Sequence, residues 1–223
     1  KKVVGGLSGS ALMRDLDHAL RLIDAVVGAV DVPVTLKTRL GWDDDCRNAS
    51  ALAQRAVAAG VQMVTIHGRT RCQFYKGCAD WAAIAPVVHA VGVPVIANGD
   101  ITSSQTAQTA LAQSEAAGVM VGRGAQGRPW LLTQIAASLS GRPVPVAPQG
   151  ADLVNLVGTH YDAMLAFYGR DLGLRVARKH LGWYAEAAGG DMVARRAVLT
   201  ATDPSQVLAL LPDMLTPMQK AAA

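Results

Sequence analysis

Short apolar runs alternate with helix-length segments along the first part of the chain. Four runs of four to six residues, rich in Val and Ile, cover residues 32–36, 61–66, 93–97 and 118–121. Between these runs, apolar residues recur at helical spacing, as at Leu12, Leu16 and Ile23. Buried strands that alternate with amphipathic helices are typical of parallel β/α repeats, so we expect an α/β fold with a parallel sheet.

A different pattern begins after a proline-rich segment. Residues 141–150 contain three prolines, which predicts an extended linker. Beyond it the apolar spacing is helical only, first around Leu153 and Val157 and again at Leu174, Ala177 and Leu181. We therefore expect a β/α part over residues 1–140, a linker over residues 141–150 and a small all-α domain over residues 151–223.

Polar residues follow each of the four apolar runs, where the strands would end. They are Lys37, His67, Asn98-Gly99-Asp100 and Gly122-Arg123. In (β/α)8 barrels the chemistry lies where the strands end, and the loops after the last two strands commonly hold a phosphate. Four strands cannot close a barrel of eight, and the chain opens in a glycine-rich loop with no initiator Met. We expect the C-terminal half of a TIM barrel, taken from a longer protein, followed by the helical domain.

The residue types at these strand ends suit an anionic ligand. Lys37 can donate a hydrogen bond to a carbonyl oxygen or stabilise developing negative charge, although a solvated rim cation is the alternative. His67 shares this rim, and a purely structural histidine is the alternative. Gly99 and Gly122 can let backbone N–H groups approach an anion, and Arg123 can donate two hydrogen bonds to phosphate oxygens. The sequence therefore predicts a ligand that carries a phosphate.

Two further groups of residues remain near the predicted rim. Asp100 would repel a phosphate, so we expect it to cap its loop or bind a hydroxyl group. The long polar loop after the second run carries Arg69, Arg71, Gln73, Tyr75 and Lys76. Cationic and aromatic groups beside such a rim suit a nucleotide, through phosphate contacts and base stacking, and a plain surface loop is the alternative.

Charge is consistent with an acidic partner but does not require one. The formal net charge is +4 and the pI is about 9.2. Arg175, Arg178 and Lys179 share one face of a predicted helix, opposite its apolar positions. This face can bind nucleic acid, and an ordinary solvated surface is the alternative.

Composition excludes several other classes of protein. With 51% hydrophobic and 17% charged residues, the chain can bury a substantial core. Cys46, Cys72 and Cys78 show no CxxC spacing, so we expect reduced thiols, with neither a metal site nor a disulfide framework. No apolar stretch reaches the ~18 residues that a membrane span needs. These features indicate a cytoplasmic protein without a membrane partner.

With these residues in place, the chain resembles the bacterial tRNA-dihydrouridine synthases, especially their B-type branch. The resemblance rests on five stretches in family order, which begin at Lys1, Leu36, Ile66, Ile96 and Gly122 and read KKVVGGLSGSALM, LKTRLGW, IHGRTR, IANGDI and GRGAQGRPW. The sequence RKHLGWY, from Arg178 to Tyr184, is similar to the helical domain of that family. One small departure is Glu115, where the family usually has Gly.

The resemblance implies a flavin-binding TIM barrel and a helical domain that helps to hold tRNA. It implies FMN as the cofactor, NADPH as the reductant, and reduction of uridine to 5,6-dihydrouridine in tRNA. By motif, Lys37 and His67 would contact the flavin ring or the uracil. The same motifs assign the ribityl chain and phosphate of FMN to Asn98, Gly99, Asp100, Gly122 and Arg123. We expect the full-length protein to be monomeric, with tRNA contacts from Arg69, Arg71, Gln73, Arg175, Arg178 and Lys179.

The proton donor of that family falls outside this sequence. It is the cysteine of an Asn-x-Gly-Cys-Pro motif that would immediately precede Lys1, and neither Cys46, Cys72 nor Cys78 occupies that position. We therefore expect this chain alone to be inactive. The alternative is a non-catalytic tRNA-binding or phosphate-binding module. An unrelated flavin barrel such as a dihydroorotate dehydrogenase fits less well, because of the Arg-Lys-His run in the helical part.

Overall fold

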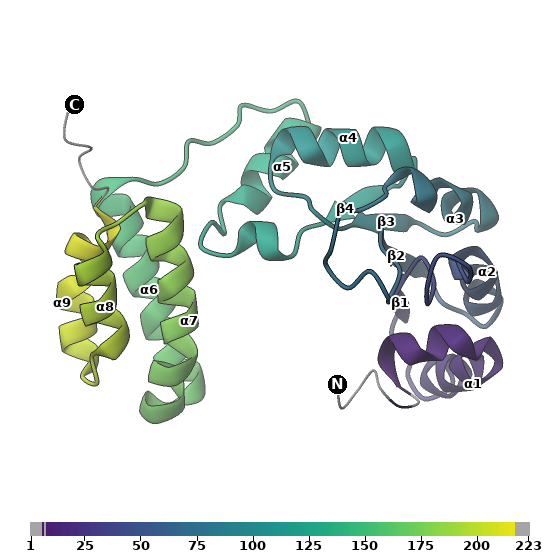
Figure 1. The fold of residues 1–223 in the computed structure, drawn as a ribbon, viewed down its shortest axis with the longest axis horizontal. Helices are drawn as coiled ribbons and strands as arrows, with labels where there is room; N and C mark the ends of the chain where they lie inside the picture. The colour runs from purple at the N-terminus through teal and green to yellow at the C-terminus, as the bar shows by residue number, and fades with distance from the viewer. Residues whose placement is uncertain (1–5, 7, 217–223) are drawn as a thin grey trace. The chain divides into compact units, whose positions relative to one another are not determined.

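Four parallel strands form one sheet whose spatial order follows the sequence, β1-β2-β3-β4, in a computed structural model that describes residues 6 and 8–216 (Figure 1). The strands are β1 (Thr35–Arg39), β2 (Met63–His67), β3 (Val95–Asn98) and β4 (Gly118–Met120). The predicted parallel α/β arrangement is confirmed. Residues 1–5 and 7 of the first matching stretch lie outside the described residues, and the expected cysteine would precede Lys1, outside the given sequence.

The first three strands begin two or three residues later than the apolar runs predict, and β4 begins at Gly118 as predicted. Val32 is 67% exposed, and pairing with β2 starts only at Thr35, opposite Met63. Pro33 explains part of the shift, because proline has no N–H to donate to a ladder. Pro94 likewise precedes β3, directly before Val95. The polar residues Lys37, His67 and Asn98 consequently belong to the strands themselves and not to the loops that follow.

One face of the sheet is apolar and packs against helices. Its residues include Val64, Ile66, Val95 and Ala97, all at most 2% exposed. The helices of this part are α1 (Leu16–Val27), α2 (Ala49–Ala58), α3 (Ala85–Ala90) and α4 (Ser104–Ser114), with short 3-10 turns η1 (Gly9–Arg14), η2 (Ala82–Ile84) and η3 (Arg123–Ala125). Among them, α2 contacts β1 and β2, and α4 contacts β3 and β4.

Local sequence explains how α4 begins and ends. Ser103 accepts a hydrogen bond from the backbone N–H of Thr106, and the Thr106 side chain bonds back in a capping box. After Ser114 the chain adopts a left-handed conformation at Glu115, with φ of 56°. Glycine is the residue that fits this conformation best, and Glu115 stands where the resembled family has Gly.

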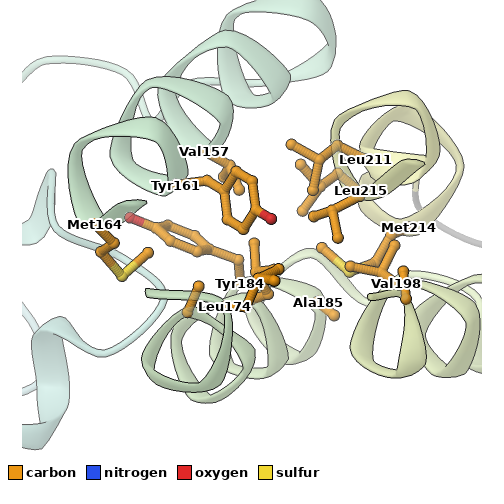
Figure 2. Close-up of a cluster of buried hydrophobic side chains, with 14 of the residues drawn as sticks. Val157, Tyr161, Met164, Leu174, Tyr184, Ala185, Val198, Leu211, Met214 and Leu215 are labelled. Carbon is orange, nitrogen blue, oxygen red and sulfur yellow. The ribbon is translucent and has the colours of Figure 1, made fainter. Parts of the chain in front are cut away.

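The second part is helical, with a core of its own. It contains α5 (Leu131–Leu139), α6 (Gly150–Tyr168), α7 (Arg170–Ala188), α8 (Met192–Thr200) and α9 (Pro204–Leu215). Figure 2 shows its buried cluster, to which α6 contributes Val157 and Tyr161, α7 contributes Tyr184 and α9 contributes Leu211, among others. The predicted apolar positions Leu174, Ala177, Leu181 and Tyr184 all lie in this core.

The chain divides into two compact units between Gly124 and Ala125, earlier than the predicted boundary at residue 140. Packing places the segment after Gly124 with the helical unit. Gly127 lies so close to α7 that an added Cβ would stand 2.2 Å from the carbonyl oxygen of Trp183. Trp130 also packs against the helical core. Residues 142–149, within the predicted linker, have no regular secondary structure.

Candidate functional site

The sheet register aligns three polar residues at the carboxyl ends of neighbouring strands. Arg39 lies opposite His67, and His67 lies opposite Asn98. In parallel strands, residues in one row point to the same face, and Lys37 joins this face two positions before Arg39. The face opposite the apolar core thus carries two cations, an imidazole and an amide within one small area.

His67 is buried among cations and is held neutral. It is 8% exposed, and its Nε2 lies 3.5 Å from Nη1 of Arg69. Burial, followed by the charges of Arg39, Lys37 and Arg69, lowers the pKa of His67 to about 4. At neutral pH the ring can therefore donate one hydrogen bond and accept another, according to its tautomer.

Arg39 and Lys37 make this end of β1 strongly positive. Nη1 of Arg39 donates to the carbonyl oxygens of Thr70 at 2.8 Å and Phe74 at 3.0 Å. Burial and then the charge of Arg39 lower the pKa of Lys37. Arg39 thus holds the loop after β2 in place while it contributes charge to the site.

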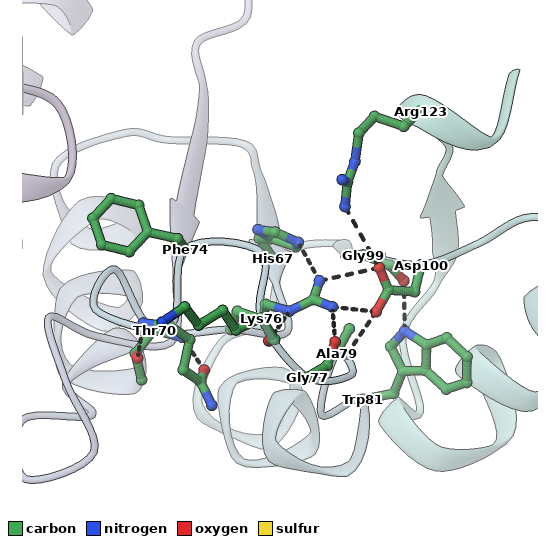
Figure 3. A network of polar contacts seen from close by, with 12 residues as sticks. His67, Thr70, Phe74, Lys76, Gly77, Ala79, Trp81, Gly99, Asp100 and Arg123 are labelled. Atoms are coloured by element: carbon green, nitrogen blue, oxygen red, sulfur yellow. Dashed lines mark hydrogen bonds and ion pairs between the residues drawn. The ribbon is translucent and has the colours of Figure 1, made fainter. Parts of the chain in front are cut away.

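Arg69, in that loop, and Asp100, in the loop after β3, form a two-point ion pair, which belongs to the network of polar contacts drawn in Figure 3. Arg69 Nη2 lies 2.5 Å from Asp100 Oδ2 and Nη1 lies 3.1 Å from Oδ1. Arg69 also donates to the carbonyl oxygens of Lys76 and Gly77, and it is 1% exposed. Arg69 was predicted to contact tRNA, whereas in this structure its donors are directed into the protein.

Asp100 braces the same loop. Its Oδ2 also accepts a hydrogen bond from the backbone N–H of Ala79, at 2.8 Å. Burial alone would raise the pKa of Asp100, but the hydrogen bonds from Arg69 and Ala79 lower it overall. Asp100 is thus an ionised internal anchor, and its Oδ1 lies 3.8 Å from Nη2 of Arg123.

The glycines around the last two strands differ in what surrounds them. An added Cβ on Gly99 would stand 2.7 Å from Cδ2 of His67, and one on Gly124 would stand 2.3 Å from the carbonyl oxygen of Ile101. These two glycines are thus required by protein packing. A Cβ on Gly122 would meet no described atom within 4 Å, so this position leaves room for a ligand near Arg123.

Tyr75, an aromatic residue of the long polar loop, lies between two arginines of the site. The Tyr75 ring is 60% exposed, and the guanidinium carbon atoms of Arg123 and Arg39 lie 4.3 and 5.5 Å from its centre. Its ring centre is 6.2 Å from that of His67. The two-residue spacing of Lys37 and Arg39 indicates that both point to the same face of the strand, whereas the position of Tyr75 depends on loop geometry that no local pattern predicts.

The remaining predicted RNA contacts lie in both units. Arg71 is half-buried, and the side-chain oxygen of Gln73 accepts a hydrogen bond from the backbone N–H of Thr70. In α7, Arg175 is exposed, and Nζ of Lys179 lies 5.1 Å from the ring centre of Trp183. Arg178 is half-buried, and its buried Nε has no hydrogen-bond partner among the described residues.

Two absences concern the described part of the chain. Over residues 6 and 8–216, no three or more His, Cys, Asp or Glu side chains are placed to hold a metal ion. No helix within the same residues is both long and apolar enough to cross a membrane.

Comparison with known proteins gives concordant matches. Residues 1–221 match the family model described as dihydrouridine synthase. A protein of Rhodobacter capsulatus named probable tRNA-dihydrouridine synthase is 65% identical over 95% of this chain. A tRNA-dihydrouridine synthase B of Xanthomonas campestris is 46% identical over 96% of it. This chain spans 64% of the length of each of these relatives.

One solved structure gives a distant match. A mandelate oxidase mutant covers 86% of this chain at 16% sequence identity, with a TM-score of 0.31. That score is too low for the match to inform the fold or the chemistry.

Proposed function

This chain belongs to the dihydrouridine synthase family, and we propose that the full-length protein reduces uridine to 5,6-dihydrouridine in tRNA. The observation that carries the proposal is the row of Arg39, His67 and Asn98, with Lys37 two positions earlier. This row presents cations and a neutral imidazole at the carboxyl ends of parallel strands, where a uracil or a flavin ring offers carbonyl oxygens.

The donor set of the site fits FMN. Arg123 has a side chain that is 59% exposed, and it lies beside Gly122, where no described atom blocks an approaching phosphate. An Arg guanidinium and unblocked backbone N–H groups are typical phosphate ligands. When bound, FMN reduced by NADPH supplies the hydride that C6 of the uracil accepts. We assign the phosphate to Gly122 and Arg123, with Asn98, Gly99 and Asp100 shaping the loop beneath it.

Lys37 and His67 would act on the carbonyl groups of the rings. A Lys ammonium at hydrogen-bond distance from a carbonyl oxygen stabilises negative charge that develops there. Neutral His67 can donate to a second acceptor without adding another positive charge. We propose that C5 receives its proton from a cysteine outside the present sequence, as the family motif implies.

We also propose that the sheet forms the C-terminal half of a TIM barrel. A cavity of about 420 Å³ lies beside β1, lined mainly by apolar side chains of α1, β1 and η1 such as Leu12, Ile23 and Leu36. Four strands leave two sheet edges, at β1 and β4. Further strands paired with these edges would fill the cavity and close the barrel.

The helical unit would bind tRNA through α7. Arg175, Arg178 and Lys179 are separated by three and four residues, so they lie on neighbouring turns of one helix. Their charges can neutralise phosphates, while the opposite side of α7 packs in the core. This assignment makes tRNA the partner of both units.

A genetic complementation experiment tests the proposal. The gene is deleted from its host, and total tRNA is digested and analysed by mass spectrometry for dihydrouridine. We expect at least one tRNA position to carry uridine in place of dihydrouridine, with recovery on expression of the wild-type protein. Recovery by Lys37→Ala at the wild-type level would remove Lys37 from the chemistry, and unchanged dihydrouridine in the deletion strain would contradict the proposed function.

A further inference from the structure

Arg71 lies between two aromatic rings that come from different loops. Its guanidinium carbon is 4.8 Å from the ring centre of Trp42 and 4.5 Å from that of Phe74. On Trp42 a second guanidinium, that of Arg14, lies at 5.0 Å. Backbone hydrogen bonds from Arg71 to Gly41 and from Cys72 to Trp42 hold the two loops side by side. We call Trp42, Arg71 and Phe74 the stacking platform.

The backbone of Phe74 adopts a strained conformation, and its ring is exposed. Its φ is +52°, in the left-handed region that bulky residues rarely adopt. Arg39 stabilises this backbone by donating to the carbonyl oxygen of Phe74. Even so, Phe74 remains 52% exposed, and Figure 3 shows its side chain apart from the Arg69–Asp100 network. Strain of this kind is concentrated at ligand-binding sites.

The charges beside the platform distinguish a base from a phosphate. Asp43, Asp44 and Asp45 follow Trp42 directly. Asp43 accepts from the backbone N–H of Cys46, and Asp44 pairs with Arg47 at 2.7 Å. These carboxylates offset the positive charges of Arg14 and Arg71 on Trp42, which disfavours a phosphate there. The face of a base carries no charge and stacks on aromatic rings and Arg planes.

We propose that the stacking platform binds an unpaired base of the tRNA that lies next to the uridine being reduced. The inference rests on the proposed function, because Arg39 connects the platform to the site: it contacts Phe74 on one side and pairs in register with His67 on the other. A base stacked on Phe74 would position its neighbour over the row of Arg39, His67 and Asn98. The platform would thus select uridines within single-stranded loops, since bases in a helix are already stacked on each other.

The test compares Phe74→Leu, which removes the ring but keeps an apolar side chain, with Phe74→Tyr, which retains the ring. Affinity of the full-length protein for tRNA is measured by fluorescence anisotropy at several salt concentrations. The chain has one other Phe, Phe167 in α6, which is 81% exposed, and Phe167→Leu is the matched control.

We expect Phe74→Leu to weaken tRNA binding about 5- to 150-fold, the range for removal of one stacked base. Phe74→Tyr and Phe167→Leu should bind as the wild type does. The slope of log affinity against log salt should not change, because stacking releases no counterions. Wild-type affinity in Phe74→Leu, a weaker slope, or an equal decrease in Phe167→Leu would each overturn the platform. Failure of the wild-type protein to bind tRNA would instead contradict the proposed function.

Discussion

Arg69 and Asp100 come from loops after neighbouring strands, and they pair through two contacts, at 2.5 and 3.1 Å, with Arg69 Nη1 lying 3.5 Å from Nε2 of His67. The pair joins the loop after β2 to the loop after β3. Because Arg39, Tyr75 and Phe74 depend on the shape of the first of these loops, the pair sets the geometry of the whole site. It also leaves Asp100 unable to repel a ligand as a free carboxylate would.

Breaking this pair should destabilise the protein. Asp100→Asn keeps the shape of the side chain but leaves Arg69, with 2% of its side chain exposed, without its counter-charge. Removing one partner of a fully buried pair costs about 3–5 kcal/mol. Because the Asp100 side chain is 31% exposed, we expect a smaller decrease of about 2–3 kcal/mol. Urea denaturation of the full-length protein measures the free energy of unfolding, and a decrease below roughly 0.5 kcal/mol, the usual size for a surface substitution, would show that the pair is not a structural anchor.

Acid should weaken the fold through His67. Its pKa is about 4 in the folded state and about 6.5 in an unfolded chain. Between these values the unfolded state binds more protons, so stability falls as pH drops from about 6.5 to about 4. His67→Gln removes this group, and its free energy of unfolding should vary less over that window. Parallel stability curves for the wild type and His67→Gln, followed by urea denaturation at several pH values, would show that His67 is protonated equally in both states.

Arg123 should contribute to flavin affinity. Its charge-assisted hydrogen bond to the FMN phosphate is worth roughly 1.5–3 kcal/mol, which corresponds to a decrease in affinity of about 10- to 150-fold for Arg123→Ala. Flavin fluorescence during titration of the apoprotein measures this affinity. Arg21→Ala, which removes an exposed Arg from α1, is the control and should bind FMN normally. Equal affinity in Arg123→Ala and the wild type would remove Arg123 from the phosphate site.

The cations of α7 should act through phosphates, unlike the stacking platform. Replacing Arg175, Arg178 and Lys179 with Ala should lower the slope of log affinity for tRNA against log salt by up to about three units, roughly one for each phosphate that is no longer neutralised. Half-buried Arg178 would contribute least. The flavin content of the purified variant should match that of the wild type. A slope like that of the wild type would mean that this face of α7 is solvated surface.

The sequence predicted the positions of the strands better than it predicted which side chains lie next to each other. Periodicity located all four strands, but Pro33 delayed the first one, so that Lys37 fell within β1. Register then aligned Arg39, His67 and Asn98, and such alignment depends on pairing between distant segments. Local spacing therefore showed that polar residues end each strand but did not show which of them share a row.

Two residues show why roles were harder to predict than positions. Arg69 looked like an exposed RNA contact, but its partner Asp100 lies 31 residues away in sequence, beyond the reach of any local pattern. Gly99 was predicted to admit an anion, whereas the His67 ring occupies the space that a side chain would need. In both cases long-range packing determined the role.

The most direct test is an assay of uridine reduction by the purified full-length protein. Unmodified tRNA is incubated with the protein, FMN and NADPH, and the nucleosides are then analysed by mass spectrometry, alongside a separate measurement of tRNA affinity. We predict dihydrouridine that depends on NADPH in the wild type, and a much slower reaction in Lys37→Ala with tRNA affinity close to that of the wild type. Tight binding of tRNA with no reduction by the wild-type protein would contradict the account and indicate a non-catalytic RNA-binding protein.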